Sequence, residues 1–75
     1  MSKKLKGLVF TALDNALEGG YAGVVGAAPE AEARSLMDYD ADVADEVERL
    51  GAGEVEVAAA VREWQSIKSK ESKNE

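Results

Sequence analysis

The densest run of side chains that could do chemistry is Asp38-Tyr39-Asp40-Ala41-Asp42. Alternating aspartates open the calcium-binding loop of an EF-hand, because their carboxylates supply the oxygen ligands that Ca²⁺ prefers. The rest of that loop departs from the pattern: its glycine position holds Val43 and its final glutamate position holds Arg49. We therefore expect no metal site of this type. Helix capping and solvation explain the aspartates, and weak divalent binding by clustered carboxylates is the remaining alternative.

The chain lacks the side chains that most often perform catalysis at neutral pH. It contains no histidine and no cysteine, so the usual general base, zinc ligands and thiolate nucleophile are missing. Thr11, Ser35 and Ser66 have no histidine to activate them, and the glycines follow no phosphate-binding pattern. We expect a protein that is not an enzyme and that uses no cofactor.

Acidic residues are concentrated in the middle of the chain. Residues 14–56 hold twelve acids against two arginines, and the whole chain has a net charge of −6. Such a segment repels the phosphates of nucleic acid and attracts a basic protein surface, although an acidic surface can also serve solubility alone. The candidate partner-binding acids, chosen because they are the most closely spaced, are Asp38, Asp40, Asp42, Asp45, Glu46 and Glu48.

Trp64 is the only tryptophan, and it follows three consecutive alanines at positions 58–60. A lone tryptophan on a helix is most often a core anchor. Tryptophan is also enriched at binding hot spots, and small neighbours allow helices to approach closely. We therefore keep Trp64 as a candidate contact for a partner or for a second copy of the chain.

The segment from Asp42 to Lys68 has the outline of a helix-turn-helix, with Gly51-Ala52-Gly53 as the turn. In a DNA-binding protein of this kind, the second helix would enter the major groove. Here that helix begins with Glu54 and Glu56, whose charges would face phosphates. An ordinary pair of helices is the better interpretation, and we do not expect nucleic acid as a partner.

Three or four helical segments are expected to position these residues. Apolar residues recur at helical spacing over residues 5–17, and Gly19-Gly20 ends that segment. Residues 21–28 indicate a packed connection or a short helical turn. Pro29 begins a further helix, and Asp40 is a plausible N-cap for a helix that ends at Leu50. A continuous helix from Pro29 to Leu50 is the alternative.

The last helix is expected over residues 54–68, followed by a polar tail over residues 69–75. With 75 residues, many alanines and one proline, the chain predicts an all-α fold of one domain over residues 1–68, built as a three- or four-helix bundle with glycine-marked turns. The expected core includes Leu8, Leu13, Val43, Val47, Val61 and Trp64. No apolar stretch has the length of a membrane span, and the absence of cysteine fits the cytoplasm.

Three functions are compatible with these features. The leading hypothesis is a non-catalytic acidic module that docks on a basic protein surface, and that inhibits or regulates a nucleic-acid-binding protein by mimicking DNA charge. The first alternative is a structural subunit that self-associates through the helix carrying Trp64. The second alternative is a small DNA-binding regulator.

Overall fold

The computed structural model describes residues 2–73, and helices account for most of them. The four α-helices are α1 (Lys3–Glu18), α2 (Pro29–Tyr39), α3 (Ala41–Leu50) and α4 (Glu54–Lys73). A short 3-10 helix, η1 (Ala22–Val25), lies in the connection between α1 and α2. The expected all-α helical bundle is confirmed, with no strand in the described residues.

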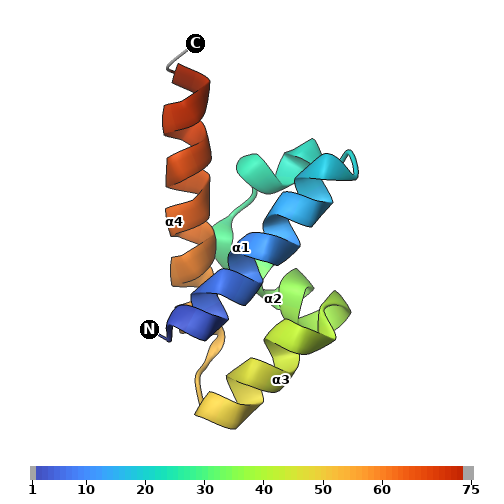
Figure 1. Ribbon diagram of the computed structural model, residues 1–75, viewed down its shortest axis with the longest axis vertical. Coiled ribbons are helices and arrows are strands. Elements are labelled where there is room, and N and C mark those ends of the chain that lie inside the picture. Colours follow the sequence, from blue (N-terminus) through green and yellow to red (C-terminus); the bar gives the residue numbers. More distant parts are fainter. Residues whose placement is uncertain (1, 74–75) are drawn as a thin grey trace.

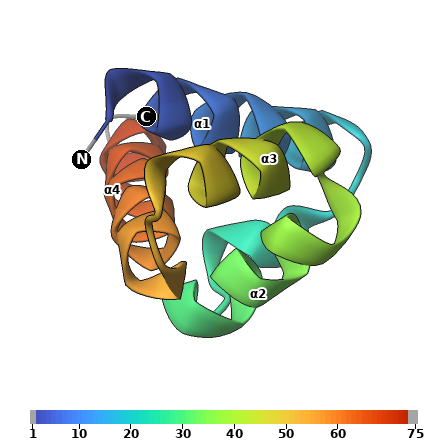
Figure 2. The same ribbon diagram turned by 90° about the horizontal axis from the view of Figure 1, so that it is seen from below.

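Helix α4 is the longest element and runs along the long axis of the molecule, with its C-terminal end extending beyond the other helices (Figure 1). It packs against α2 and α1, while α3 packs against the same two helices at the other end. Seen from below, α1 and α2 lie on either side of α3, and α4 closes one side of the arrangement (Figure 2). None of the described helices is long and apolar enough to cross a membrane.

One hydrophobic core joins all four helices and η1. Leu5, Val9 and Leu13 recur every four residues on α1, which places them on one face of that helix, and all three are fully buried. Of the residues expected in the core, Leu13, Val43, Val61 and Trp64 are buried, whereas Leu8 and Val47 are half-buried at its edge. The core also takes in Val24, Ala33, Leu36, Val57, Ala58 and Ala60.

Asp40 separates α2 from α3, so the segment from Pro29 to Leu50 forms two helices. Its backbone is extended, with φ −109° and ψ 103°, and its carboxylate accepts a hydrogen bond of 3.1 Å from the Val43 N–H. The expected N-cap is confirmed. At the other end of α3, Gly51 adopts φ +66°, a left-handed conformation that favours glycine.

Replacing Asp40 by alanine should lower the free energy of unfolding by about 1 kcal/mol, because one N–H at the start of α3 loses its acceptor. Denaturant unfolding of Asp40→Ala and of the control Asp38→Ala checks this. Asp38 is exposed on the same stretch of chain and caps no helix. Equal midpoints for the two variants would contradict the capping role.

Helix α4 continues to Lys73, so residues 69–73 are helical and the expected polar tail is wrong over that range. Neither glycine nor proline interrupts these residues, and Lys68 pairs with Glu71 one turn later, with Nζ 3.5 Å from Oε2. Charged residues with good helix propensity can thus extend a helix beyond its apolar stripe. Residues 74 and 75 lie outside the described part of the chain.

Candidate functional site

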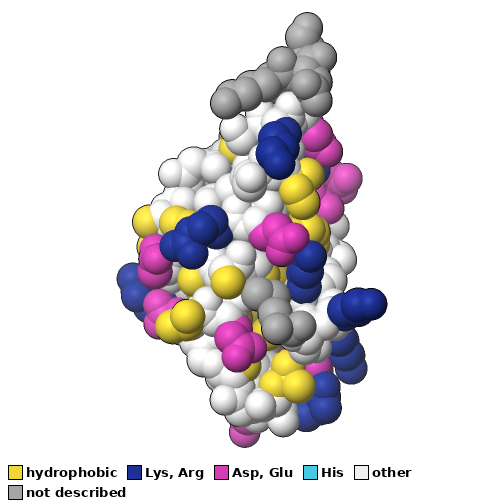
Figure 3. All heavy atoms as spheres, turned by 90° about the vertical axis from the view of Figure 1, so that its left-hand side faces the viewer, with side chains coloured by type: hydrophobic (Ala, Val, Ile, Leu, Met, Phe, Trp, Pro, Cys, Tyr) yellow, Lys and Arg dark blue, Asp and Glu magenta, His cyan; other side chains and the backbone are white. Residues whose placement is uncertain are grey.

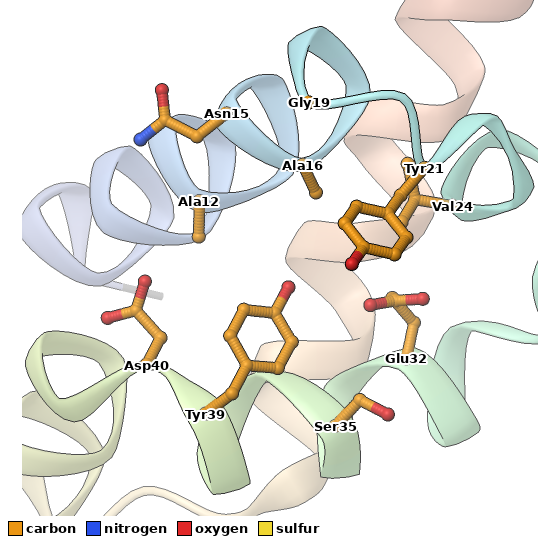
Figure 4. Close-up of a pocket in the computed structure, with 10 residues that line it drawn as sticks. All are labelled: Ala12, Asn15, Ala16, Gly19, Tyr21, Val24, Glu32, Ser35, Tyr39 and Asp40. Carbon is orange, nitrogen blue, oxygen red and sulfur yellow. The ribbon is translucent and has the colours of Figure 1, made fainter.

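A groove of about 570 Å³ lies between α1, η1 and one face of α2 (Figure 4). Its volume falls in the range of ligand-binding pockets, about 300–1,000 Å³. The lining residues come from all three elements and the turn after α1: Ala12, Asn15, Ala16, Gly19, Tyr21, Val24, Glu32, Ser35, Tyr39 and Asp40.

The two walls of the groove differ in chemistry. Ala12 and Ala16 of α1 present only methyl groups, and the buried Val24 of η1 continues that apolar surface. The opposite wall, from α2, carries Glu32 and Tyr39 (Figure 4). The groove is therefore amphipathic, which suits a ligand that has an apolar stem and a polar head.

Two tyrosines project into the groove from opposite sides, with their hydroxyl groups directed towards its centre (Figure 4). Tyr21 is 72% exposed and Tyr39 is 57% exposed, so both rings are accessible. Tyr21 owes its position to the turn after α1, where Gly20 adopts φ +100° and the Tyr21 N–H donates to the Ala16 carbonyl at 2.9 Å.

The groove is electrically negative. Among its lining residues are the two carboxylates of Glu32 and Asp40, and neither lysine nor arginine is present among the described residues that line it. Burial raises the pKa of the Tyr39 hydroxyl above its usual value, and the negative charges of Glu32 and Asp40 raise it further. Tyr39 thus stays protonated at neutral pH and can donate a hydrogen bond.

The raised pKa of Tyr39 should appear in an alkaline titration followed by tyrosinate absorbance. Tyr39 should ionise at a higher pH than an unperturbed tyrosine, whose pKa is about 10. Replacement by phenylalanine should remove the part of the absorbance change that appears above that pH. If the signal lost in Tyr39→Phe appears at or below the pH at which an unperturbed tyrosine ionises, the electrostatic description of the groove is wrong.

The structure divides the six candidate acids among different places. Only Asp40 lines the groove. Asp42 and Asp45 border a shallower cleft between α1 and α3, where Lys4 also lies, while Asp38 and Glu48 are exposed elsewhere on α2 and α3.

Glu46 is the exception to the expected exposure, because its side chain is only 4% exposed. Its two carboxylate oxygens accept from Arg49, with Nε to Oε1 at 3.0 Å and Nη2 to Oε2 at 2.5 Å, and Lys4 lies 3.7 Å away. Glu46 lies three residues after the buried Val43, which places it on the same, inward-facing side of α3. Glu46 is committed to contacts within the chain and does not belong to an exposed acidic ridge.

The hydrogen bonds from Arg49, followed by the nearby charges of Arg49 and Lys4, hold the pKa of Glu46 below its ordinary value of 4.5, although burial opposes this shift. A carboxyl whose pKa is lowered on folding stabilises the native state above its unfolded pKa, and this stabilisation is lost as the pH falls through the folded pKa. Glu46→Gln should therefore be less stable than the wild type at pH 7, and the difference should shrink below pH 4.5.

Urea unfolding at a series of pH values measures this difference. Glu48→Gln on the same helix is the control, because Glu48 is exposed and has no ion pair in the described residues. If the difference in stability between Glu46→Gln and the wild type does not depend on pH, Glu46 is not ionised in the folded state and the prediction is wrong.

Trp64 lies in the core and is only 1% exposed. Its Nε1–H donates to Asp14 Oδ1 at 2.9 Å, and Lys68 Nζ lies 3.3 Å from the same oxygen and 5.6 Å from the centre of the indole ring. The side chain joins α4 to α1 and offers no surface to a partner. The expectation that Trp64 contacts a partner is therefore wrong, and its role as a core anchor is the correct one.

Most of the basic side chains form ion pairs with acids of the same chain. Lys6, Arg34, Arg62 and Lys68 pair with acids across helix boundaries, and the α4 side of the molecule shows both charges intermingled (Figure 3). Six carboxylates of α2, α3 and the Asp40 residue between them have no ion pair within the described residues. We call these the unpaired acids: Glu32, Asp38, Asp40, Asp42, Asp45 and Glu48.

Sequence reasoning missed Tyr21, Tyr39 and Glu32 as site residues. Tyr39 lies inside the aspartate run, and a tyrosine among acids in a polar segment was an available signal. Tyr21 follows the Gly19-Gly20 turn, but only the packing of the α1–η1 connection beside α2 brings it opposite Tyr39.

Within residues 2–73 no group of three or more carboxylates lies close enough together to hold a metal ion. Neither a family model, nor a curated protein, nor a solved structure matches the chain. The function must therefore be inferred from the groove and the charges alone.

Proposed function

We propose that this protein is a non-catalytic acidic module that binds a basic surface of a partner protein. The observation that carries the proposal is the amphipathic groove with two exposed tyrosines and two carboxylates, Glu32 and Asp40. Exposed tyrosines supply contact area at low entropic cost, and carboxylates select a positive partner. The groove thus has the chemistry of a recognition site.

The distribution of ion pairs supports the same proposal. Basic residues neutralise acids mainly where helices meet α4, whereas six of the eight acids without an ion pair in residues 2–71 lie on α2, on α3 or at Asp40 between them; the other two are Glu18 and Glu56. Like charges on neighbouring turns cost folding free energy through repulsion. A basic partner would relieve that repulsion, so the binding free energy would include a favourable electrostatic contribution that falls as salt rises.

The biological role that we propose is inhibition or regulation of a nucleic-acid-binding protein. A surface that binds phosphates is basic, and carboxylates on two helices compete for the same lysines and arginines. Displacement of a bound oligonucleotide from such a protein, measured by fluorescence anisotropy, tests the role. Formation of a ternary complex without displacement would contradict it.

The two alternatives have less support in the described residues. Self-association through the alanine–tryptophan face of α4 requires Ala58, Ala60 and Trp64 to be accessible, and all three are buried within the chain. For DNA binding, Arg62 would have to read a base, but it is paired with Glu30 at 3.0 Å, and α3 and α4 each pack mainly against α1 and α2.

A direct test titrates the protein with an amidated peptide of four Gly-Arg repeats by isothermal calorimetry at low and physiological salt. We expect binding at low salt that weakens as salt rises, and no binding of a polyglutamate peptide of the same length. Absence of binding to the arginine peptide at low salt, or equal binding of both peptides, would refute the proposed function.

A further inference from the structure

The groove combines aromatic rings with carboxylates. Its centre is bounded by the hydroxyls of Tyr21 and Tyr39 and by the Glu32 carboxylate, with the Asp40 carboxylate further along the same wall (Figure 4). Flat aromatic rings, hydroxyl acceptors and carboxylates within one groove suit a flat cation with several N–H donors.

We propose that the groove binds the side chain of an arginine of the partner, with its guanidinium group between Tyr21 and Tyr39 and its donors directed to Glu32, while Asp40 adds negative potential from further along the wall. This inference rests on the proposed function and names the residue type that the groove recognises. The apolar wall of Ala12 and Ala16 would contact the methylene groups of the arginine side chain.

Arginine fits this groove better than lysine for a geometric reason. The guanidinium group is planar, stacks on aromatic faces and presents five donors in a fixed fork that matches a carboxylate. An ammonium group is a compact, strongly hydrated charge that loses more solvation when it enters such a site. The two tyrosines therefore favour arginine, whereas unpaired acids outside the groove attract either cation equally.

A free anion or an acidic peptide does not fit the same groove. Its described lining includes two carboxylates and no basic side chain to neutralise a negative ligand. The raised pKa of Tyr39, to which Glu32 and Asp40 contribute, shows that the negative potential of both carboxylates reaches the ring that closes the groove. Charge complementarity thus selects a cation, and the aromatic rings select a flat one.

The experiment compares two amidated peptides, one of four Gly-Arg repeats and one of four Gly-Lys repeats, by calorimetry and by backbone amide NMR shifts. The wild type should bind the arginine peptide more tightly, by about two- to fivefold for each cation–π interaction that the guanidinium makes with a tyrosine ring. The largest shifts should fall on the residues that line the groove. Tyr21→Ala, Tyr39→Ala and Glu32→Gln should each reduce the preference for arginine.

Two control variants test whether a reduced preference for arginine is specific to changes in the groove. Glu56→Gln removes one charge from an exposed acid of α4, and Val55→Ala trims a side chain that is 81% exposed on the same helix. Both should keep the preference for arginine. Circular dichroism of every variant establishes whether it is folded. The two tyrosine substitutions are tested separately, so if one variant is unfolded, the other still tests the inference.

The results separate the two proposals. If neither peptide binds, the proposed function fails and this inference fails with it. If both peptides bind equally, or if the shifts fall on α3 and not on the groove, the acidic module stands and the arginine site is wrong. A preference for arginine that survives in both tyrosine variants also overturns the inference.

Discussion

Trp64→Ala should lower the free energy of unfolding by about 3–5 kcal/mol, the usual cost of removing a buried aromatic ring. A domain of 75 residues is expected to be stable by only about 4–11 kcal/mol in total. The substitution should therefore remove a large fraction of the total stability and lower the melting temperature strongly. Thermal melting followed by helical circular dichroism measures the effect.

Trp64→Phe is the matched control, because it keeps an aromatic ring in the core while it removes the Nε1–H bond to Asp14 and part of the buried ring area. It should be destabilised less than Trp64→Ala, with the cooperative transition retained. A Trp64→Ala protein that melts like the wild type would show that the ring is not a core anchor. The tryptophan would then again be a candidate for a partner contact.

The helices could be predicted from the sequence because each carries a local signal. Apolar residues at helical spacing predicted α1 and α4, Pro29 marked the start of α2, and the Asp40 cap separated α2 from α3. The end of α4 could not be predicted, because helix propensity alone extends it past the last apolar residue.

The candidate site was less predictable because it depends on contacts between elements. The charge of Asp40 was visible in the sequence, but the groove that it shares with Tyr21 exists only because the α1–η1 connection lies opposite α2. Glu46 was wrongly placed on an exposed ridge, since composition does not reveal that Arg49 pairs with it at the edge of the core. Burial of Trp64 follows from the packing of α4 against α1.

Neutralising four unpaired acids outside the groove should slow association with a basic partner by about tenfold or more at low salt, because electrostatic steering contributes about 10–10³ to association rates. The variant replaces Asp38, Asp42 and Asp45 by asparagine and Glu48 by glutamine. The dissociation rate should change much less, since charges at a rim act mainly on encounter. Stopped-flow fluorescence with the labelled Gly-Arg peptide gives both rates.

The same variant should fold at least as well as the wild type, because these four acids make no ion pair with the described side chains of residues 2–71 and repel one another. Thermal melting checks this point. An unfolded variant would show that the acids are structural. An unchanged association rate in a folded variant would show that they serve solubility alone.

The central claim is that a particular acidic surface, and not net charge as such, recognises a basic partner. The most direct measurement compares two double variants that each remove two negative charges: Asp42→Asn with Asp45→Asn on α3, and Glu18→Gln with Glu56→Gln on other helices. Their association rates with the Gly-Arg peptide are measured at low salt. We predict that the α3 pair slows association clearly more than the control pair. Equal slowing by both pairs would mean that the peptide responds only to net charge, and it would contradict the claim.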